Sequence, residues 1–219
     1  MKVRVVIDVE MCRVHTKNTT YPYKNEIIQI GAVLMNENYE IQSEFSTYVK
    51  PQFGKVDYYI SMLTGISERT LKNAPHIEEA LTQMLNWIGS SEVVFYSWSD
   101  TDYYQIRNEI QQKCDEDVRW ERLLNQANWI DYQRKLGDRL ESYKLLRLTE
   151  ALDLAEVDTS GKLHDGLDDA LNTARMIAKL ETNKDYRTII ERLREKEKSQ
   201  EPLTTPLGGL LQGLLLETA

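Results

Sequence analysis

The chain has 219 residues, of which 41% are apolar and 28% charged, and its formal net charge is −8 at pH 7. This composition is that of an ordinary soluble protein with one domain and a sizeable core. The negative charge argues against a protein that coats nucleic acid through a broad basic face. It is compatible with an enzyme that binds a few nucleotides.

The cysteines and the N-terminal residues indicate the compartment. Cys12 and Cys114 are far apart and lack metal-ligand spacing, which fits a reducing compartment without a disulfide framework. No secretory signal pattern follows Met1, and no apolar run reaches the length of a transmembrane helix. We therefore expect a cytoplasmic location and no membrane partner.

Three strands are predicted near the start of the chain. Residues Val3–Glu10 form an apolar run rich in valine and isoleucine, which is typical of a buried central strand. Strand character returns over Glu26–Met35 and Tyr39–Lys50, with a short turn at Asn36–Asn38 between them. Because short connections join them, we expect an antiparallel meander.

The middle of the chain predicts a parallel extension of that sheet. A mostly helical stretch runs from Pro51 to Gly89, and Glu92–Ser97 then has the pattern of a fourth strand. A long helical crossover is what a parallel connection requires. The remaining predicted elements are a helix from about Asp102, a short strand over Asn128–Tyr132, and helices around Tyr143–Leu154 and Leu167–Leu180. The pattern predicts an α/β fold whose five-stranded mixed sheet is flanked by helices.

The C-terminal part of the chain differs in composition. We expect a compact domain over residues 1–183, a charged helical extension over 184–201, and a tail rich in leucine and glycine over 202–219. Prolines and glycines exclude a continuous helix across the tail. The tail either docks on a protein partner or a second copy, packs back on its own domain, or remains disordered. We hypothesise the partner contact.

A first acidic motif ends the opening strand. Asp8 and Glu10 are two residues apart, so both carboxylates leave the same face of a strand. At the end of a buried strand two such groups repel each other and lose hydration, and this is costly unless a cation lies between them. The alternative for this motif alone is a solvated strand end.

A second acidic motif lies where the fourth strand passes into a helix. Sites collect at strand ends in open α/β sheets, so Asp100 or Asp102 is expected to face Asp8. Either aspartate could instead simply cap the helix. We prefer Asp102 as the ligand because Ile106 and Glu109 follow it with helical spacing.

A third motif combines a histidine with acids. His164 and Asp169 are five residues apart, so they converge only if His164 lies in a loop and Asp169 in the first turn of the next helix. Gly166 is expected to permit that bend. The alternatives are a surface histidine and a pair of acids, Asp168 and Asp169, placed at a helix start for the helix dipole.

Together the motifs predict a metal site. Asp8, Glu10, Asp102 and Asp169 would form a cage of four carboxylates with His164 at its edge. Oxygen ligands of this kind suit Mg²⁺ or Mn²⁺. Two such ions clamp the attacking and leaving oxygens of a phosphodiester, and a histidine can take the proton from the attacking water.

Five segments match the motifs of one family, in order and with the right spacing. They are Ile7–Glu10, Asn25–Val33, Leu63–Ile66, Ser97–Glu109 and His164–Ala170. On these segments the chain resembles a DnaQ-like 3′→5′ exonuclease of the DEDDh class, within the ribonuclease H-like fold, from about Lys2 to Leu180. Within that family the resemblance is to KapD-like bacterial proteins and ERI-1-like RNA exonucleases.

The resemblance implies hydrolysis of single-stranded RNA or DNA from the 3′ end to nucleoside 5′-monophosphates. It does not decide whether RNA or DNA is the preferred substrate. It implies that Leu63 and Thr64 line the pocket for the terminal nucleotide. Met11, which is also expected to contact the substrate, stands where many proofreading members have a threonine. Trp98 either stacks on a base or belongs to the core. The rival function is a binding module of the same fold that does little chemistry.

Overall fold

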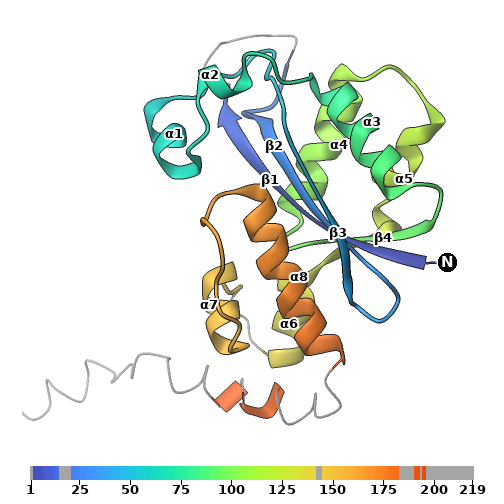
Figure 1. The fold of residues 1–219 in the computed structure, drawn as a ribbon, viewed down its shortest axis with the longest axis vertical. Helices are drawn as coiled ribbons and strands as arrows, with labels where there is room; N and C mark the ends of the chain where they lie inside the picture. Colours follow the sequence, from blue (N-terminus) through green and yellow to red (C-terminus); the bar gives the residue numbers. More distant parts are fainter. Residues whose placement is uncertain (1, 15–20, 142–144, 183–189, 193, 196–219) are drawn as a thin grey trace, which may run out of the picture.

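A five-stranded mixed sheet forms the centre of the protein, in the order β3-β2-β1-β4-β5 (Figure 1). The computed structural model describes residues 2–14, 21–141, 145–182, 190–192 and 194–195. β1, β2 and β3 pair in antiparallel fashion, whereas β4 is parallel to β1 and β5 is parallel to β4. The strands are β1 Lys2–Arg13, β2 Asn25–Met35, β3 Ile41–Tyr48, β4 Glu92–Ser97 and β5 Trp129–Asp131. The predicted meander and parallel extension are confirmed.

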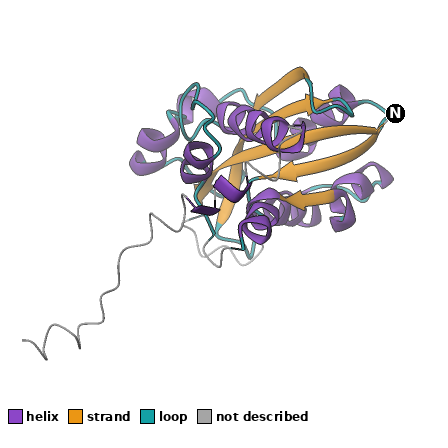
Figure 2. Ribbon diagram, turned by 90° about the horizontal axis from the view of Figure 1, so that it is seen from below, coloured by secondary structure: helices purple, strands orange, loops and turns teal. Residues whose placement is uncertain are grey.

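Helices cover both faces of the sheet (Figure 2). One face packs against α3 and α4, and the other packs against α6, α7 and α8. The helices are α1 Tyr58–Thr64, α2 Glu68–Leu71, α3 Ile77–Ile88, α4 Thr101–Lys113, α5 Glu121–Leu124, α6 Tyr132–Leu140, α7 Leu148–Leu154 and α8 Gly166–Thr182, with two 3₁₀ turns, η1 Val118–Trp120 and η2 Gln126–Asn128. None of the helices in these ranges is long and apolar enough to cross a membrane.

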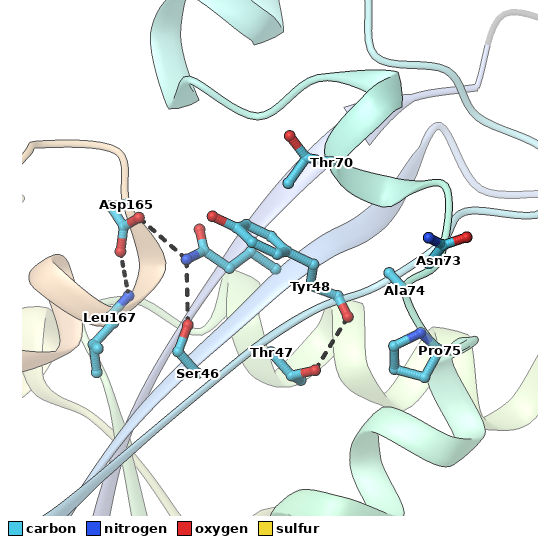
Figure 3. Close-up of a pocket in the computed structure, with 10 residues that line it drawn as sticks. Ser46, Thr47, Tyr48, Thr70, Asn73, Ala74, Pro75, Asp165 and Leu167 are labelled. Atoms are coloured by element: carbon cyan, nitrogen blue, oxygen red, sulfur yellow. Dashed lines mark hydrogen bonds between the residues drawn. The ribbon is translucent and has the colours of Figure 1, made fainter.

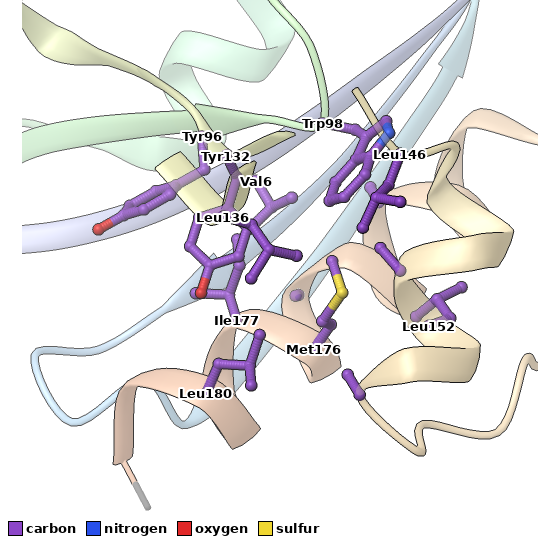
Figure 4. Packing of buried hydrophobic residues seen from close by; sticks show 14 of the residues in the cluster. Val6, Tyr96, Trp98, Tyr132, Leu136, Leu146, Leu152, Met176, Ile177 and Leu180 are labelled. Carbon is purple, nitrogen blue, oxygen red and sulfur yellow. The ribbon is translucent and has the colours of Figure 1, made fainter. Parts of the chain in front are cut away.

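The two cores result from the alternation of side chains along β1. Val5 and Ile7 contribute to the core under α3 and α4, whereas Val6 belongs to the core under α8. Figure 4 shows Val6 beside Tyr96, Leu136 and other apolar side chains on that second face. Because alternate residues share a face, the face of Val6 is also the face of the acids that follow it.

A close approach of backbones holds the start of α8 on the sheet. A Cβ atom at Gly31 would lie 2.1 Å from the backbone carbon of Gly166, so only glycine fits there. Gly31 is also the register partner of Asp8 in the pairing of β1 with β2. The contact therefore fixes the first turn of α8 next to the acidic end of β1.

Some element boundaries differ from the sequence-based prediction. β1 continues to Arg13, three residues beyond the predicted end of the strand at Glu10. The helix predicted around Tyr143–Leu154 begins only at Leu148, and residues 142–144 lie outside the described ranges. The prediction also missed α6, which buries Tyr132, Leu136 and Leu140, four residues apart.

The C-terminal division of the chain stays a prediction. The predicted tail over 202–219 and most of the extension lie outside the described residues. Within the extension, Ile190 is buried in the core under α8. Arg194 donates two hydrogen bonds to the backbone oxygen of Arg139, at 3.0 and 2.7 Å.

Candidate active site

Four carboxylates from three elements meet beside the C-terminal half of β1. Asp8 and Glu10 stand on the face of β1 that faces α8. Asp102 lies in the first turn of α4, and Asp169 in the first turn of α8. The other three acids each raise the pKa of Asp8, so all four lie within electrostatic range of one another. The predicted acids converge in the folded chain.

A backbone hydrogen bond places Asp102. β4 pairs with β1 only as far as Val6, so the N–H of Val9 lies beyond this ladder and needs another acceptor. Asp102 Oδ1 accepts it at 3.1 Å, and the side chain is buried. Asp100 is the N-cap residue of α4 and forms no side-chain capping bond among the described residues. Of the two candidates, Asp102 is therefore the one that contacts β1.

His164 and Asp169 are joined across a left-handed turn. The backbone N–H of His164 donates to Asp169 Oδ2 at 2.9 Å, and His164 itself has a φ of 63°. The bend therefore occurs at the histidine, and the prediction that Gly166 makes it was wrong. A Cβ atom at Gly166 would lie 3.1 Å from the backbone oxygen of Asp8, so this glycine permits close packing instead.

Burial and mutual repulsion perturb the carboxylates. Burial, with Asp169 and Asp102 nearby, raises the pKa of Glu10 to about 8. Burial also raises the pKa of Asp102 to about 7, although the Val9 hydrogen bond opposes it. The pKa values of Asp8 and Asp169 are likewise raised, chiefly by burial. Such a cluster favours either protons or a cation.

The donor set fits a divalent cation. Ligand atoms of Glu10, His164 and Asp169 lie within 4.8 Å of one another. Asp169 Oδ1 is buried and has no hydrogen-bond donor within the described part of the chain. A buried carboxylate oxygen without a donor is costly, and a bound cation would satisfy it.

Sequence reasoning missed three residues beside the acids. Asp165 raises the pKa of Glu10, and its Oδ1 accepts the N–H of Leu167 at 3.0 Å. Lys162 is a nearby positive charge that lowers the pKa of Glu10. Gln29 is the register partner of Glu10 on β2. The signal for Asp165 was its place before a helix start, where aspartate commonly caps the helix.

A pocket adjoins the carboxylates on the side of β3. It has a volume of about 490 Å³ and lies between β3, the α2–α3 connection and the start of α8 (Figure 3). Its walls include Gln29, Ser46, Tyr48, Thr70, Asn73 and Asp165. The pocket and the acidic cluster are therefore neighbouring parts of one surface.

The predicted substrate-contacting residues differ in their surroundings. Met11 is half-buried against the core under α3 and α4, and Leu63 is half-buried in α1. The Thr64 hydroxyl is committed to the fold, because it donates to the backbone oxygen of Ile60 at 2.9 Å. Trp98 is 8% exposed and lies in the core under α8, so we assign it to the core alternative.

The sheet order, the flanking helices and the acidic cluster define a ribonuclease H-like exonuclease fold. The nuclease domain of 3′hExo, described as a DEDDh family member bound to rAMP, superposes with a TM-score of 0.70 at 21% identity. That match covers 84% of this chain and 94% of the other. Residues 5–177 match the RNase_T model, described as an exonuclease, and the chain belongs to this family.

Individual relatives agree with the predicted ERI-1-like resemblance. ERI1 exoribonuclease 2 of Xenopus laevis is 29% identical, over 80% of this chain and 28% of its own length. The 3′-5′ exonuclease Snipper of Drosophila melanogaster is 26% identical, over 71% of this chain and 60% of its own length. The chain thus spans less than two thirds of the length of these relatives.

Proposed function

We propose that the chain is a metal-dependent 3′→5′ exonuclease that hydrolyses single-stranded RNA or DNA ends to nucleoside 5′-monophosphates. The observation that carries this proposal is the convergence of four carboxylates and a histidine at one end of β1. Membership of the exonuclease family and the names of the relatives support the reaction and its direction.

The metal proposal rests on the carboxylate oxygens. Asp8, Glu10, Asp102 and Asp169 would hold two Mg²⁺ or Mn²⁺ ions, because these ions prefer oxygen ligands. When bound, such a pair neutralises charge on the scissile phosphate and on its attacking and leaving oxygens. The raised pKa of Glu10 supports the assignment, since a cation would take the place of the retained proton.

His164 is the proposed general base. It lies on an exposed loop at the edge of the acids, and its backbone is held by Asp169. Histidine is suited to accept a proton near neutral pH, so His164 would take the proton of the attacking water. Its exposure would let the proton pass on to solvent after each turnover.

The test is degradation of 5′-labelled RNA and DNA of matched sequence in Mg²⁺, Mn²⁺ or EDTA. We expect a metal-dependent ladder that shortens from the 3′ end. Asp8→Ala should abolish it, whereas Asp138→Ala, which removes an exposed carboxylate on α6, should not. A fully active Asp8→Ala variant would reject the proposal. Binding without cleavage by the wild type would favour the binding-module alternative.

A further inference from the structure

The pairing of β1 with β2 shifts its register directly after Glu10. Glu10 lies opposite Gln29. The next residue of β1, Met11, lies opposite Ile27, so Ile28 is an extra residue on β2 and the strands form a β-bulge. A bulge bends its strand, increases the local twist and changes the direction of nearby side chains. The proposed metal ligand Glu10 therefore stands at the point where the strand pair bends.

Glu109 on α4 supplies a hydrogen-bond acceptor at this bulge. The backbone N–H of Ile27 donates to Glu109 Oε1 at 2.7 Å. Gln105 Nε2 donates to the same oxygen at 3.0 Å, and Lys113 Nζ contacts Oε2. The Glu109 side chain is buried, and these partners hold it in one place. The bulge therefore has a fixed acceptor that belongs to a different element of the fold.

α4 contacts the backbone on both sides of Glu10. Asp102 accepts the N–H of Val9, the residue before Glu10. Glu109 accepts the N–H of Ile27, which lies opposite the residue after Glu10. The two acids are two helical turns apart, so both side chains project from the same side of α4. One helix thereby holds β1 just before the bulge and β2 at the bulge.

We propose that Glu109 is a positioning residue, which orients the carboxylate of Glu10 toward the acidic cluster by holding the bulge. The inference rests on the proposed function, in which Glu10 binds a metal ion. Glu109 acts through the backbone, because Ile27, Gln105 and Lys113 occupy its two oxygens. Replacing a residue that orients a metal ligand weakens metal binding even though that residue does not touch the ion.

A purely structural role for Glu109 predicts a different result. If Glu109 only attaches α4 to the sheet, its replacement lowers the free energy of unfolding but leaves each folded molecule with a normal site. If it orients Glu10, the folded molecules themselves bind the ion more weakly. The metal affinity of the folded protein therefore separates the two roles without any measurement of turnover.

The experiment measures the Mn²⁺ affinity of the full chain by calorimetry, without substrate and at a temperature where circular dichroism shows each variant to be folded. Glu109→Ala removes the acceptor, so the affinity should fall about tenfold. Glu109→Gln keeps an oxygen that can accept the Ile27 N–H, so most of the affinity should return. At a fixed Mn²⁺ concentration, the rate of hydrolysis of a 5′-labelled strand should follow the same order.

A second variant tests the proposal in case Glu109→Ala does not fold. Glu109→Asp keeps the negative charge near Lys113 but shortens the side chain by one methylene group, which draws the carboxylate away from Ile27. It should therefore also weaken Mn²⁺ binding severalfold.

The matched control is Leu136→Ala, a truncation on α6 in the core under α8, on the other face of the sheet from α4 (Figure 4). It should destabilise the fold but leave the Mn²⁺ affinity of the folded protein unchanged. Wild-type affinity in the folded Glu109→Ala and Glu109→Asp proteins, or an equal loss with Leu136→Ala, would overturn the positioning role while hydrolysis by the wild type persists. A wild type that neither binds Mn²⁺ nor hydrolyses a strand would reject the proposed function and this inference together.

Discussion

Lys113 lies between two buried glutamates, and its replacement by methionine should strongly destabilise the fold. Its side chain is 3% exposed, and its Nζ contacts both Glu26 on β2 and Glu109 on α4. Both glutamates are also almost fully buried. Methionine would preserve most of the volume of the stem but leave two carboxylates without their cation. We expect a loss of about 3–5 kcal/mol, the usual cost of breaking a buried ion pair.

The loss should depend on pH in a defined direction. Burial alone would raise the pKa of Glu26, but hydrogen bonds from Lys113 and from the Gln52 and Gly54 N–H groups lower it from 4.5. In the wild type this group therefore stabilises the fold above about pH 4.5 and loses that contribution as pH falls through its folded pKa. Without Lys113, burial should dominate and raise the pKa. The difference in free energy of unfolding between the variant and the wild type should thus widen from pH 5 to pH 8.

Urea unfolding at both pH values measures the effect. The matched control is Lys135→Met, because Lys135 is 29% exposed and its partner Glu181 keeps an ion pair with Arg139 at 2.7 Å. We expect the control to lose less than about 1 kcal/mol, because this pair is partly exposed and Glu181 keeps a second cation. A loss below about 1 kcal/mol for Lys113→Met, or a gap that narrows toward pH 8, would refute the argument.

Three further predictions concern the site and its support. His164→Ala should lower kcat roughly 10²–10⁴-fold while divalent-metal affinity by calorimetry stays near that of the wild type; an unchanged kcat would exclude the histidine as base. Gly31→Ala should lower the melting temperature markedly, because its Cβ would lie 2.1 Å from the backbone of Gly166; a wild-type melting curve would contradict the close approach. Finally, the folded pKa values of about 8 for Glu10 and about 7 for Asp102 exceed the unfolded values. In EDTA, the contribution of these two groups to the free energy of unfolding should be complete below about pH 4 and lost toward pH 8, and excess Mg²⁺ should reduce that loss. Urea titrations measure it, and a metal-free unfolding midpoint that rises from pH 4 to pH 8 would contradict the prediction.

The sheet and the acids were predictable because their signals are local. Apolar runs such as Val3–Glu10 mark strands by their own periodicity, and the position of Asp8 and Glu10 within the run fixes their common face. The spacing of His164 and Asp169 required a loop before a helix start, which the fold contains. In each case a few neighbouring residues carried the information.

Other features depend on contacts between residues far apart in the chain, and the sequence pattern does not predict those contacts. Lys113 lies in a polar stretch and looks solvated, yet it contacts Glu26, 87 positions away. In the sequence, Gln29 looks like any other residue of a strand. In the structure, its side chain forms hydrogen bonds with Gly166 and Asp165 at the start of α8. The helix α6 has apolar residues with helical spacing, but Gly137 and its many charges weaken that signal.

The network around Lys113 also bears on how mutations in the acidic cluster should be interpreted. Glu109 lies two turns after Asp102 on α4, and it accepts the backbone N–H of Ile27 at 2.7 Å, while Asp102 accepts that of Val9. α4 is thus attached to β2 and to β1 by two separate carboxylates. Asp8 has no part in either attachment, so its removal relieves repulsion within the cluster and leaves both intact. An inactive Asp8→Ala protein that unfolds at or above the wild-type urea concentration would therefore have lost chemistry rather than structure.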